Sequence, residues 1–189
     1  MFNRRQRISA FTLIELLVVI AIIAILASIL LPAMNAAFRK AEKTQAQTEI
    51  KSIETAVKAF YSDYGKFPAG NGNPSGNDYS YGGLGGYSAS YRPNFELMNV
   101  LRGIDTTNNP RKTVYLEIPQ DSISSNNYID PWGQQYEVTI DTGFNGVCNS
   151  LQGGYPDVTN KMVVIWSRGP NGVVNPPPNN DDDLRSWEL

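Results

Sequence analysis

The sequence predicts an α+β fold in which a long N-terminal helix packs on a small antiparallel sheet. The helix is indicated by an apolar stretch over residues 11–38 and by a helical spacing of apolar residues that continues to about Tyr64. Short β-capable runs follow only in the second half of the chain, around Val114, Val138 and Val164. Such strands give the apolar face of the helix a sheet to pack against, which is typical of an α+β domain.

The composition argues against an enzyme and against a nucleic-acid-binding protein. The 189 residues carry a formal net charge of −2, and the positive charges outside the first ten residues are scattered. The chain has no histidine, the commonest general base and metal ligand at neutral pH, and it lacks C-x-x-C, phosphate-loop and G-x-S-x-G patterns. Cys148 is alone and cannot form an intramolecular disulfide, so we expect a small, partly buried apolar residue.

The apolar stretch is long enough to span a membrane. From Leu16 to Phe38 there is no charged side chain, which is sufficient helix for a hydrocarbon core about 30 Å thick. Positive residues precede it and predict a cytoplasmic N-terminus, with the C-terminal domain on the other side of the membrane; they are Arg4, Arg5 and Arg7. The simpler interpretations are a signal anchor or a secretory signal, but a secretory apolar region is usually about 7–15 residues long and this one is longer.

Glu15 lies inside the apolar stretch and needs a partner. A carboxylate there costs a few kcal/mol in lipid, and no lysine or arginine lies within the stretch. Cleavage between Ala10 and Phe11 would create an amino group about one helical turn from Glu15. Because helix geometry disfavours pairing within the same chain, the amino group of a neighbouring subunit is the easier partner.

The motif Phe11-Thr12-Leu13-Ile14-Glu15 resembles the class III signal of type IV pilins and type II secretion pseudopilins. The resemblance implies that residues 1–10 are a leader removed by a prepilin peptidase and that the new N-terminus, Phe11, is methylated. Pro32 stands where the family carries a helix-loosening proline, and it lacks the N–H that a helix interior uses. The family usually has glycine before the cleaved bond, where this chain has Ala10.

The helix is expected to leave the membrane and enter the domain. Residues 11–38 form the membrane and filament-core segment, and residues 39–68 contain the amphipathic half of the same helix. Its apolar stripe follows spacings of three and four: Ile50, Ile53, Val57, Phe60 and Tyr64. Gly65 is suited to end the helix, and Pro68 prevents its continuation.

Residues 69–189 are predicted to form the globular domain. Residues 69–93 are rich in Gly, Asn, Ser and Tyr, which indicates either a solvated surface loop or a binding surface for sugars, partners or the next subunit. Residues 94–102 predict a short helix that stops at Gly103, and residues 113–118 predict a strand.

Two motifs follow in the C-terminal part. Residues 128–136 contain Asp-Pro-Trp-Gly and read as a turn leading into a strand at 136–140, and residues 162–167 predict a second strand that runs into Ser-Arg-Gly-Pro-Asn-Gly. This order is similar to the C-terminal half of the major pseudopilin of type II secretion. It is less similar to type IV pilins, which typically end in a disulfide-closed loop. Residues 69–112 have no clear counterpart.

The resemblance also implies a calcium site in the C-terminal loop. Oxygen ligands at about 2.3–2.6 Å are what calcium requires. The implied ligands are the backbone carbonyl of Arg168, the side chain of Asn171, and one or both of Asp182 and Asp183. Most relatives have aspartate at the position of Asn171, so this site has one negative charge fewer, which Asp181 could compensate. The alternative is a solvated acidic tail.

The function implied is a structural subunit of a type II secretion pseudopilus. Subunits would leave the inner membrane through an assembly platform and form a helical homo-oligomeric filament in the periplasm, with Glu15 neutralising the Phe11 amino group of a neighbour. Minor pseudopilins would be further partners, and no nucleic acid is expected. The alternatives are a type IV pilin or minor pilin for adhesion or DNA uptake, or a simple membrane-anchored binding domain.

Overall fold

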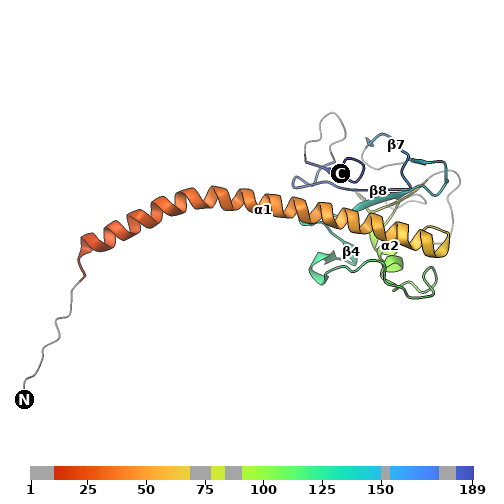
Figure 1. Cartoon of the computed structure of the whole chain (residues 1–189), viewed down its shortest axis with the longest axis horizontal. Coiled ribbons are helices and arrows are strands. Elements are labelled where there is room, and N and C mark those ends of the chain that lie inside the picture. The colour runs from red at the N-terminus through yellow and green to blue at the C-terminus, as the bar shows by residue number, and fades with distance from the viewer. Residues whose placement is uncertain (1–10, 69–77, 84–90, 150–153, 175–181) are drawn as a thin grey trace, which may run out of the picture. The chain divides into compact units, whose positions relative to one another are not determined.

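The computed structural model describes residues 11–68, 78–83, 91–149, 154–174 and 182–189 (Figure 1). The chain divides into two compact units between Ala41 and Glu42. Helix α1, Leu13–Tyr64, supplies the described part of the first unit and continues into the second.

Helix α1 is continuous through Pro32 and ends as the sequence predicts. Gly65 adopts a positive φ of 63° and its N–H donates to the Tyr61 carbonyl at 2.8 Å. A glycine in this left-handed conformation satisfies an end carbonyl of the helix at no steric cost, so the helix stops at Tyr64.

The part of α1 that belongs to the first unit has an apolar surface. Between Phe11 and Ala41 every side chain except that of Ala27 is exposed. Among the described residues, α1 is the one helix long and apolar enough to cross a membrane, and none of its most apolar segment is buried within the protein. A helix that is apolar all round requires an apolar environment from outside its own chain.

The second unit is built on a five-stranded sheet of order β2-β1-β5-β8-β9. Its pairs are antiparallel except β1 with β2, and β5 pairs β8 in a register that places Val138 opposite Ile165. The strands are β1 Tyr79–Tyr81, β2 Tyr91–Arg92, β5 Glu137–Ile140, β8 Val163–Ser167 and β9 Leu184–Arg185. Two small hairpins join β3 Ile123–Ser124 with β4 Asn127–Tyr128, and β6 Val147–Cys148 with β7 Val158–Thr159. Two further helical elements are α2 Asn94–Leu101 and the 3₁₀ turn Gln120–Ser122.

The core lies between α1, α2 and one face of the sheet. The apolar stripe of α1 is fully buried at Ile50, Ile53, Val57 and Phe60, and it shares one cluster with Val138 and Ile165. Alternate residues of β8 point to opposite faces, so Val164 and Trp166 join a second cluster with Cys148 and Tyr155. Burial raises the pKa of the Cys148 thiol to about 12, as expected of a structural cysteine.

Two local predictions are wrong. Residues 113–118 form no strand: the N–H groups of Tyr115 and Leu116 both donate to the Leu101 carbonyl, at 2.8 and 3.2 Å. This segment therefore caps the end of α2 instead of pairing in the sheet, and Val114 is 56% exposed. This side of the sheet comes instead from β1 and the edge strand β2, which lie within the stretch predicted as a loop. The rest of that stretch, 69–77 and 84–90, lies outside the described residues.

The buried stripe predicts a large effect of truncation at its centre. Replacing Phe60 with alanine should lower the free energy of unfolding by about 3–5 kcal/mol, because it leaves a cavity where the Phe60 ring now contacts the Tyr64 and Tyr115 rings. Urea unfolding of the full chain in detergent measures this. Thr55→Ala on the exposed side of α1 is the control and should change stability by less than about 0.5 kcal/mol. Equal effects of the two substitutions would contradict the packing described.

Candidate functional site

The first turn of α1 holds Glu15 in a reciprocal hydrogen-bonded arrangement with Thr12. One Glu15 carboxylate oxygen accepts from the Thr12 N–H at 2.8 Å and from the Thr12 hydroxyl at 2.7 Å. The Glu15 N–H donates to the Thr12 hydroxyl oxygen at 3.3 Å. Since the helix begins at Leu13, Thr12 is its N-cap and Glu15 its third residue, which is a capping box.

The role of Thr12 was missed by the sequence analysis, although Thr-x-x-Glu before an apolar run is the signature of a capping box. Within the described part of the chain, no lysine or arginine forms an ion pair with Glu15. Phe11 is 75% exposed, and Ala10 lies outside the described residues. The pairing of Glu15 with a Phe11 amino group therefore stays a prediction, and in the single chain Thr12 donates both hydrogen bonds to one oxygen of the carboxylate.

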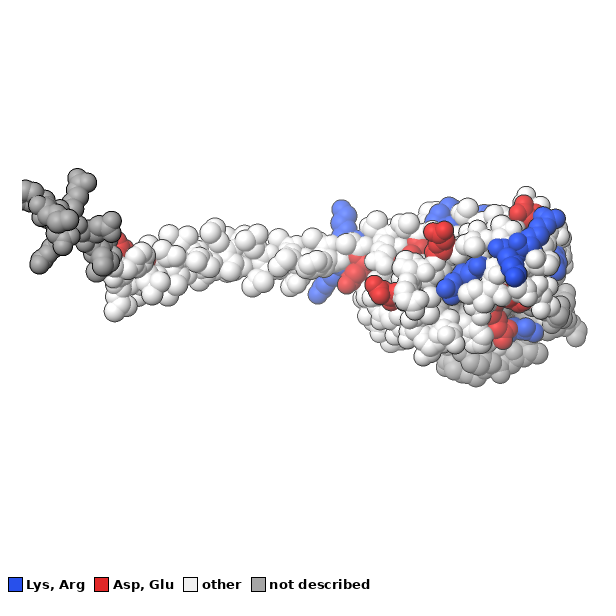
Figure 2. All heavy atoms as spheres, turned by 90° about the horizontal axis from the view of Figure 1, so that it is seen from below, with Lys and Arg blue, Asp and Glu red and all other residues white. Residues whose placement is uncertain are grey.

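The helix that follows offers a long surface for contacts with lipid or with other apolar helices. Figure 2 shows no charged side chain along this part of α1 on the face drawn, apart from its two ends. The exposed large apolar side chains include Leu17, Ile20, Ile23, Leu26, Leu30, Met34 and Phe38. Such a surface is far larger than monomeric proteins expose to water.

The C-terminal loop brings two of the predicted calcium ligands together. The Asn171 side-chain amide donates to one Asp182 oxygen at 2.9 Å, and the Asn171 backbone N–H donates to the other at 3.2 Å. A Cβ atom at Gly169 would lie 2.2 Å from the Asp182 carbonyl oxygen, so only glycine permits this close approach of the two segments.

Asp183 points elsewhere. Its carboxylate accepts a hydrogen bond from the Tyr155 hydroxyl, and it is buried against the second cluster. Burial and the Asp183 carboxylate both raise the pKa of Tyr155, which keeps this hydroxyl a donor. Among the described residues no group of three or more His, Cys, Asp or Glu could hold a metal ion, and Asp181 lies outside them. In this loop Asp182 thus accepts from the Asn171 amide nitrogen, the Asn171 side-chain oxygen accepts from the Val173 N–H at 2.6 Å, and Asp183 is engaged by Tyr155.

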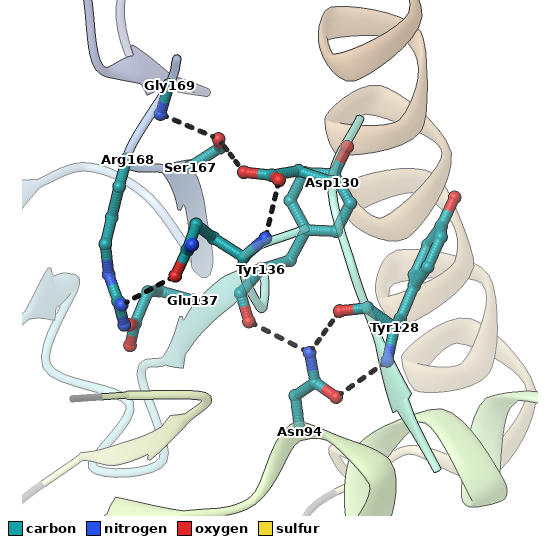
Figure 3. Close-up of polar contacts among 9 residues, drawn as sticks. Asn94, Tyr128, Asp130, Tyr136, Glu137, Ser167, Arg168 and Gly169 are labelled. Carbon is teal, nitrogen blue, oxygen red and sulfur yellow. Dashed lines mark hydrogen bonds and ion pairs between the residues drawn. The ribbon is translucent and has the colours of Figure 1, made fainter. Parts of the chain in front are cut away.

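Arg168 has a structural role that the sequence analysis did not predict. Its guanidinium forms a buried ion pair with Glu137 at 2.5 Å and lies 3.4 Å from the Gln134 side-chain oxygen (Figure 3). Burial raises the pKa of Glu137 to about 7, and the guanidinium opposes that shift. The side chain of Arg168 is therefore fixed inside the domain.

The two C-terminal motifs form one polar network. Asp130 accepts from the backbone N–H groups of Trp132 and Gln134 at 3.0 and 2.8 Å, which closes the Asp-Pro-Trp-Gly turn. The Ser167 hydroxyl donates to the other Asp130 oxygen at 2.5 Å and accepts from the Gly169 N–H at 3.1 Å (Figure 3). Burial raises the pKa of Asp130, while Ser167 opposes the shift. The turn thereby holds the start of the C-terminal loop.

The capping box predicts that the Thr12 hydroxyl stabilises the first turn. Thr12→Val keeps the shape of the side chain and removes the hydroxyl, at a cost of about 1 kcal/mol, so amide hydrogen exchange at residues 13–16 should become about fivefold faster. Exchange measured in detergent micelles reports this, and Thr12→Ser is the matched control because it keeps the hydroxyl. Identical exchange in the two variants would show that the hydroxyl does not cap the helix.

Comparison with known proteins agrees with this arrangement. Residues 5–31 match the family model of the prokaryotic N-terminal methylation motif. The chain is 35% identical over 187 residues to the type II secretion system core protein G of Aeromonas hydrophila, covering 98% of this chain and 96% of that protein. It is 26% identical over 187 residues to the core protein G of Dickeya chrysanthemi, covering 99% of this chain and 90% of that protein.

Similarity to type IV pilins is more local. The type IV major pilin protein PilA of Myxococcus xanthus is 38% identical over 85 residues, which cover 42% of this chain and 38% of that protein. No solved structure matches the chain. The similarity to core protein G, in contrast, extends over nearly the whole length and includes the domain. The chain therefore belongs to the family of type II secretion system core protein G, whose members are pilin-like structural subunits and not enzymes.

Proposed function

We propose that this chain is a major-pseudopilin-type subunit that assembles from the inner membrane into a periplasmic filament driving protein export. The observation that carries the proposal is the full-length similarity to core protein G, 35% identity over 98% of the chain. The type IV pilin alternative has support over 42% of the chain. A simple membrane-anchored binding domain would leave the N-terminal methylation motif at residues 5–31 unexplained.

The apolar part of α1 has two successive environments in this proposal. Before assembly it spans the inner membrane, with the leader in the cytoplasm and the domain in the periplasm. A prepilin peptidase cuts between Ala10 and Phe11 and Phe11 is methylated. The assembly platform then moves the subunit into a filament, where its apolar helix packs against those of other copies. This interface joins different surfaces of successive subunits, so it propagates instead of closing.

Glu15 exchanges partners during this transfer. In the single chain its carboxylate is bound by Thr12, with both contacts shorter than 3 Å. In the filament the Glu15 carboxylate pairs with the Phe11 amino group of a neighbour. The attraction between two opposite charges is much stronger in an apolar core than in water. The exchange sets the axial register of one subunit on the next.

Pro32 gives α1 a local weakness in the same region. The helix is continuous there, but a proline ring crowds the carbonyl four residues earlier, at Ser28, and supplies no N–H. The apolar half of the helix can stretch at this point during assembly, while the amphipathic half stays packed in the domain.

The C-terminal loop is proposed to bind one calcium ion weakly. Asn171 and Asp182 are already in contact, and the Arg168 carbonyl belongs to the same loop. To bind the ion, the Asn171 side-chain oxygen must give up its hydrogen bond from the Val173 N–H. Asp183 joins them only by giving up its hydrogen bond from Tyr155. Bound calcium would neutralise the carboxylates and hold the two segments of the loop together.

Assembly should depend on Glu15. Glu15→Ala should insert in the membrane and be processed, yet give no filaments and no export, because the neighbour's amino group loses its partner. The measurements are the amount of sheared filament and the secretion of an exported protein. Glu117→Ala, which removes an exposed charge of the domain, is the control. If Glu15→Ala formed as many filaments as the unmodified chain, the proposed pairing would be excluded. If the unmodified chain formed filaments that do not support export, the type IV pilin alternative would be favoured.

Calcium should stabilise the domain through Asp182. At a calcium concentration about ten times the dissociation constant, stabilisation of about 1.4 kcal/mol should raise the melting temperature by about 5 °C relative to a chelator. Asp182→Asn should abolish the shift, whereas Glu188→Gln, at the exposed C-terminus, should keep it. Equal melting temperatures of the unmodified chain with calcium and with chelator would refute the site.

A further inference from the structure

A hairpin of the domain, residues 128–136, lies against α1 in the second unit. Its two arms are joined by a bridge between Ile129 and Gln135, and the Asp130 N–H donates to the Gln134 carbonyl at 2.7 Å. The Asp-Pro-Trp-Gly turn forms its tip, where the Gly133 N–H donates to the Asp130 carbonyl at 2.9 Å. We refer to residues 128–136 as the clamp hairpin.

Two carboxylates of α1 hold the clamp hairpin. Glu42 accepts a hydrogen bond from the Trp132 indole N–H at 3.1 Å, and Glu49 accepts one from the Tyr136 hydroxyl. These glutamates are seven residues apart, so they lie on the same face of the helix, about 10.5 Å apart along its axis. One carboxylate therefore binds the tip of the hairpin and the other its base.

The base of the clamp hairpin keeps its donors in the protonated form. The rings of Tyr128 and Tyr136 meet edge to face with centroids 5.0 Å apart. Burial raises the pKa of both hydroxyls, and the Glu49 carboxylate raises it further. Neither hydroxyl ionises near neutral pH, so the Tyr136 hydroxyl remains a hydrogen-bond donor to Glu49.

The other side of the clamp hairpin is fixed to the domain. The Asn94 side chain, fully buried at the start of α2, donates to the carbonyls of Tyr128 and Tyr136 at 2.7 and 3.2 Å. It also accepts from the Tyr128 N–H at 3.0 Å (Figure 3). With Asp130 bonded to Ser167, both the base and the tip are anchored to neighbouring elements. The hairpin is thus a fixed part of the domain to which α1 is attached.

The Trp132 contact coincides with the change in the environment of α1. Residues 28–41 are exposed, Glu42 is the first partly buried residue after them, and the first fully buried side chain is Ala46. The boundary between the two compact units also lies between Ala41 and Glu42. Core packing by itself begins one turn later. The hydrogen bond to Trp132 extends the attachment of α1 back to this boundary, on a stretch where Lys43 and Gln47 also line a hollow with Glu188 and Leu189.

We infer that the Trp132–Glu42 hydrogen bond determines where the rigid part of α1 begins. Helices lose structure cooperatively from a weak point or an end, and the process stops where tertiary contacts raise its cost. Loosening that starts near Pro32 therefore stops at Glu42, and Trp132 is the positioning residue. This inference concerns the chain by itself and stands whether or not the chain forms filaments.

Hydrogen exchange of the full chain in detergent micelles tests the inference. Trp132→Phe removes the indole N–H and keeps an aromatic ring. Amides of residues 42–46 should exchange about tenfold faster, while those of residues 53–60 should be unchanged. Glu42→Ala should have the same effect, the double variant should be no worse than either single one, and Glu42→Gln should retain protection because its amide oxygen still accepts. Trp187→Phe, which packs on the second cluster, is the matched control.

Three results would overturn the inference. The first is unchanged exchange at residues 42–46 in Trp132→Phe or Glu42→Ala. The second is equal acceleration across residues 42–64, which would mean a general loss of stability. The third is additivity of the two substitutions, which would mean that they act through different contacts.

Discussion

The structure depends on the burial of one stripe of α1 against the sheet. Ile50, Ile53, Val57 and Phe60 are all fully buried, and each side chain of this size contributes about 1.5–3 kcal/mol when removed from water. These residues, β5 and β8 share a single core with α2. The polar network around Asp130 and Arg168 rests on strands that this core holds in place, and so does the C-terminal loop.

The same helix meets two different requirements along its length. Over residues 16–38 its surface has no charged side chain and, apart from Ala27, is exposed, which suits lipid or other apolar helices. From Glu42 onward it is amphipathic and belongs to the domain. The capping box at Thr12 and Glu15 satisfies N–H groups at the start of the helix, which would be costly to leave unpaired in the proposed membrane environment. Family membership and this division together are the basis of the proposed transfer from a membrane to a filament.

The features of the fold that the sequence predicted correctly are those determined by residues close to one another in the chain. The end of α1 at Tyr64 follows from Gly65, and β5 and β8 follow from short apolar runs beside turn residues. Residues 113–118 have the composition of a strand, but their N–H groups bond to Leu101, which only the placement of α2 decides. Strand β1 lies between stretches rich in Gly and Ser, so its pairing with β5 has no local signal.

The site was predictable to a similar degree. The Phe11–Glu15 motif indicated the N-terminal methylation motif that the family model matches at residues 5–31, whereas the role of Glu15 in assembly stays a prediction. The Thr12 cap was readable from its spacing. The proximity of Asn171 and Asp182 agrees with the motif order, whereas the direction of Asp183 toward Tyr155 arises from a residue 28 positions away. The contacts of Glu42 and Glu49 with the hairpin span 90 and 87 positions, and sequence spacing carries no information on them.

The intact mass and the N-terminal sequence of the chain extracted from membranes test the proposed processing, on which the assembly depends. We predict a chain that begins at Phe11 and carries one added methyl group on its amino terminus. A chain that begins at Met1 would contradict it, because Glu15 would then have no amino-terminal partner in a neighbouring subunit and α1 would be a simple anchor.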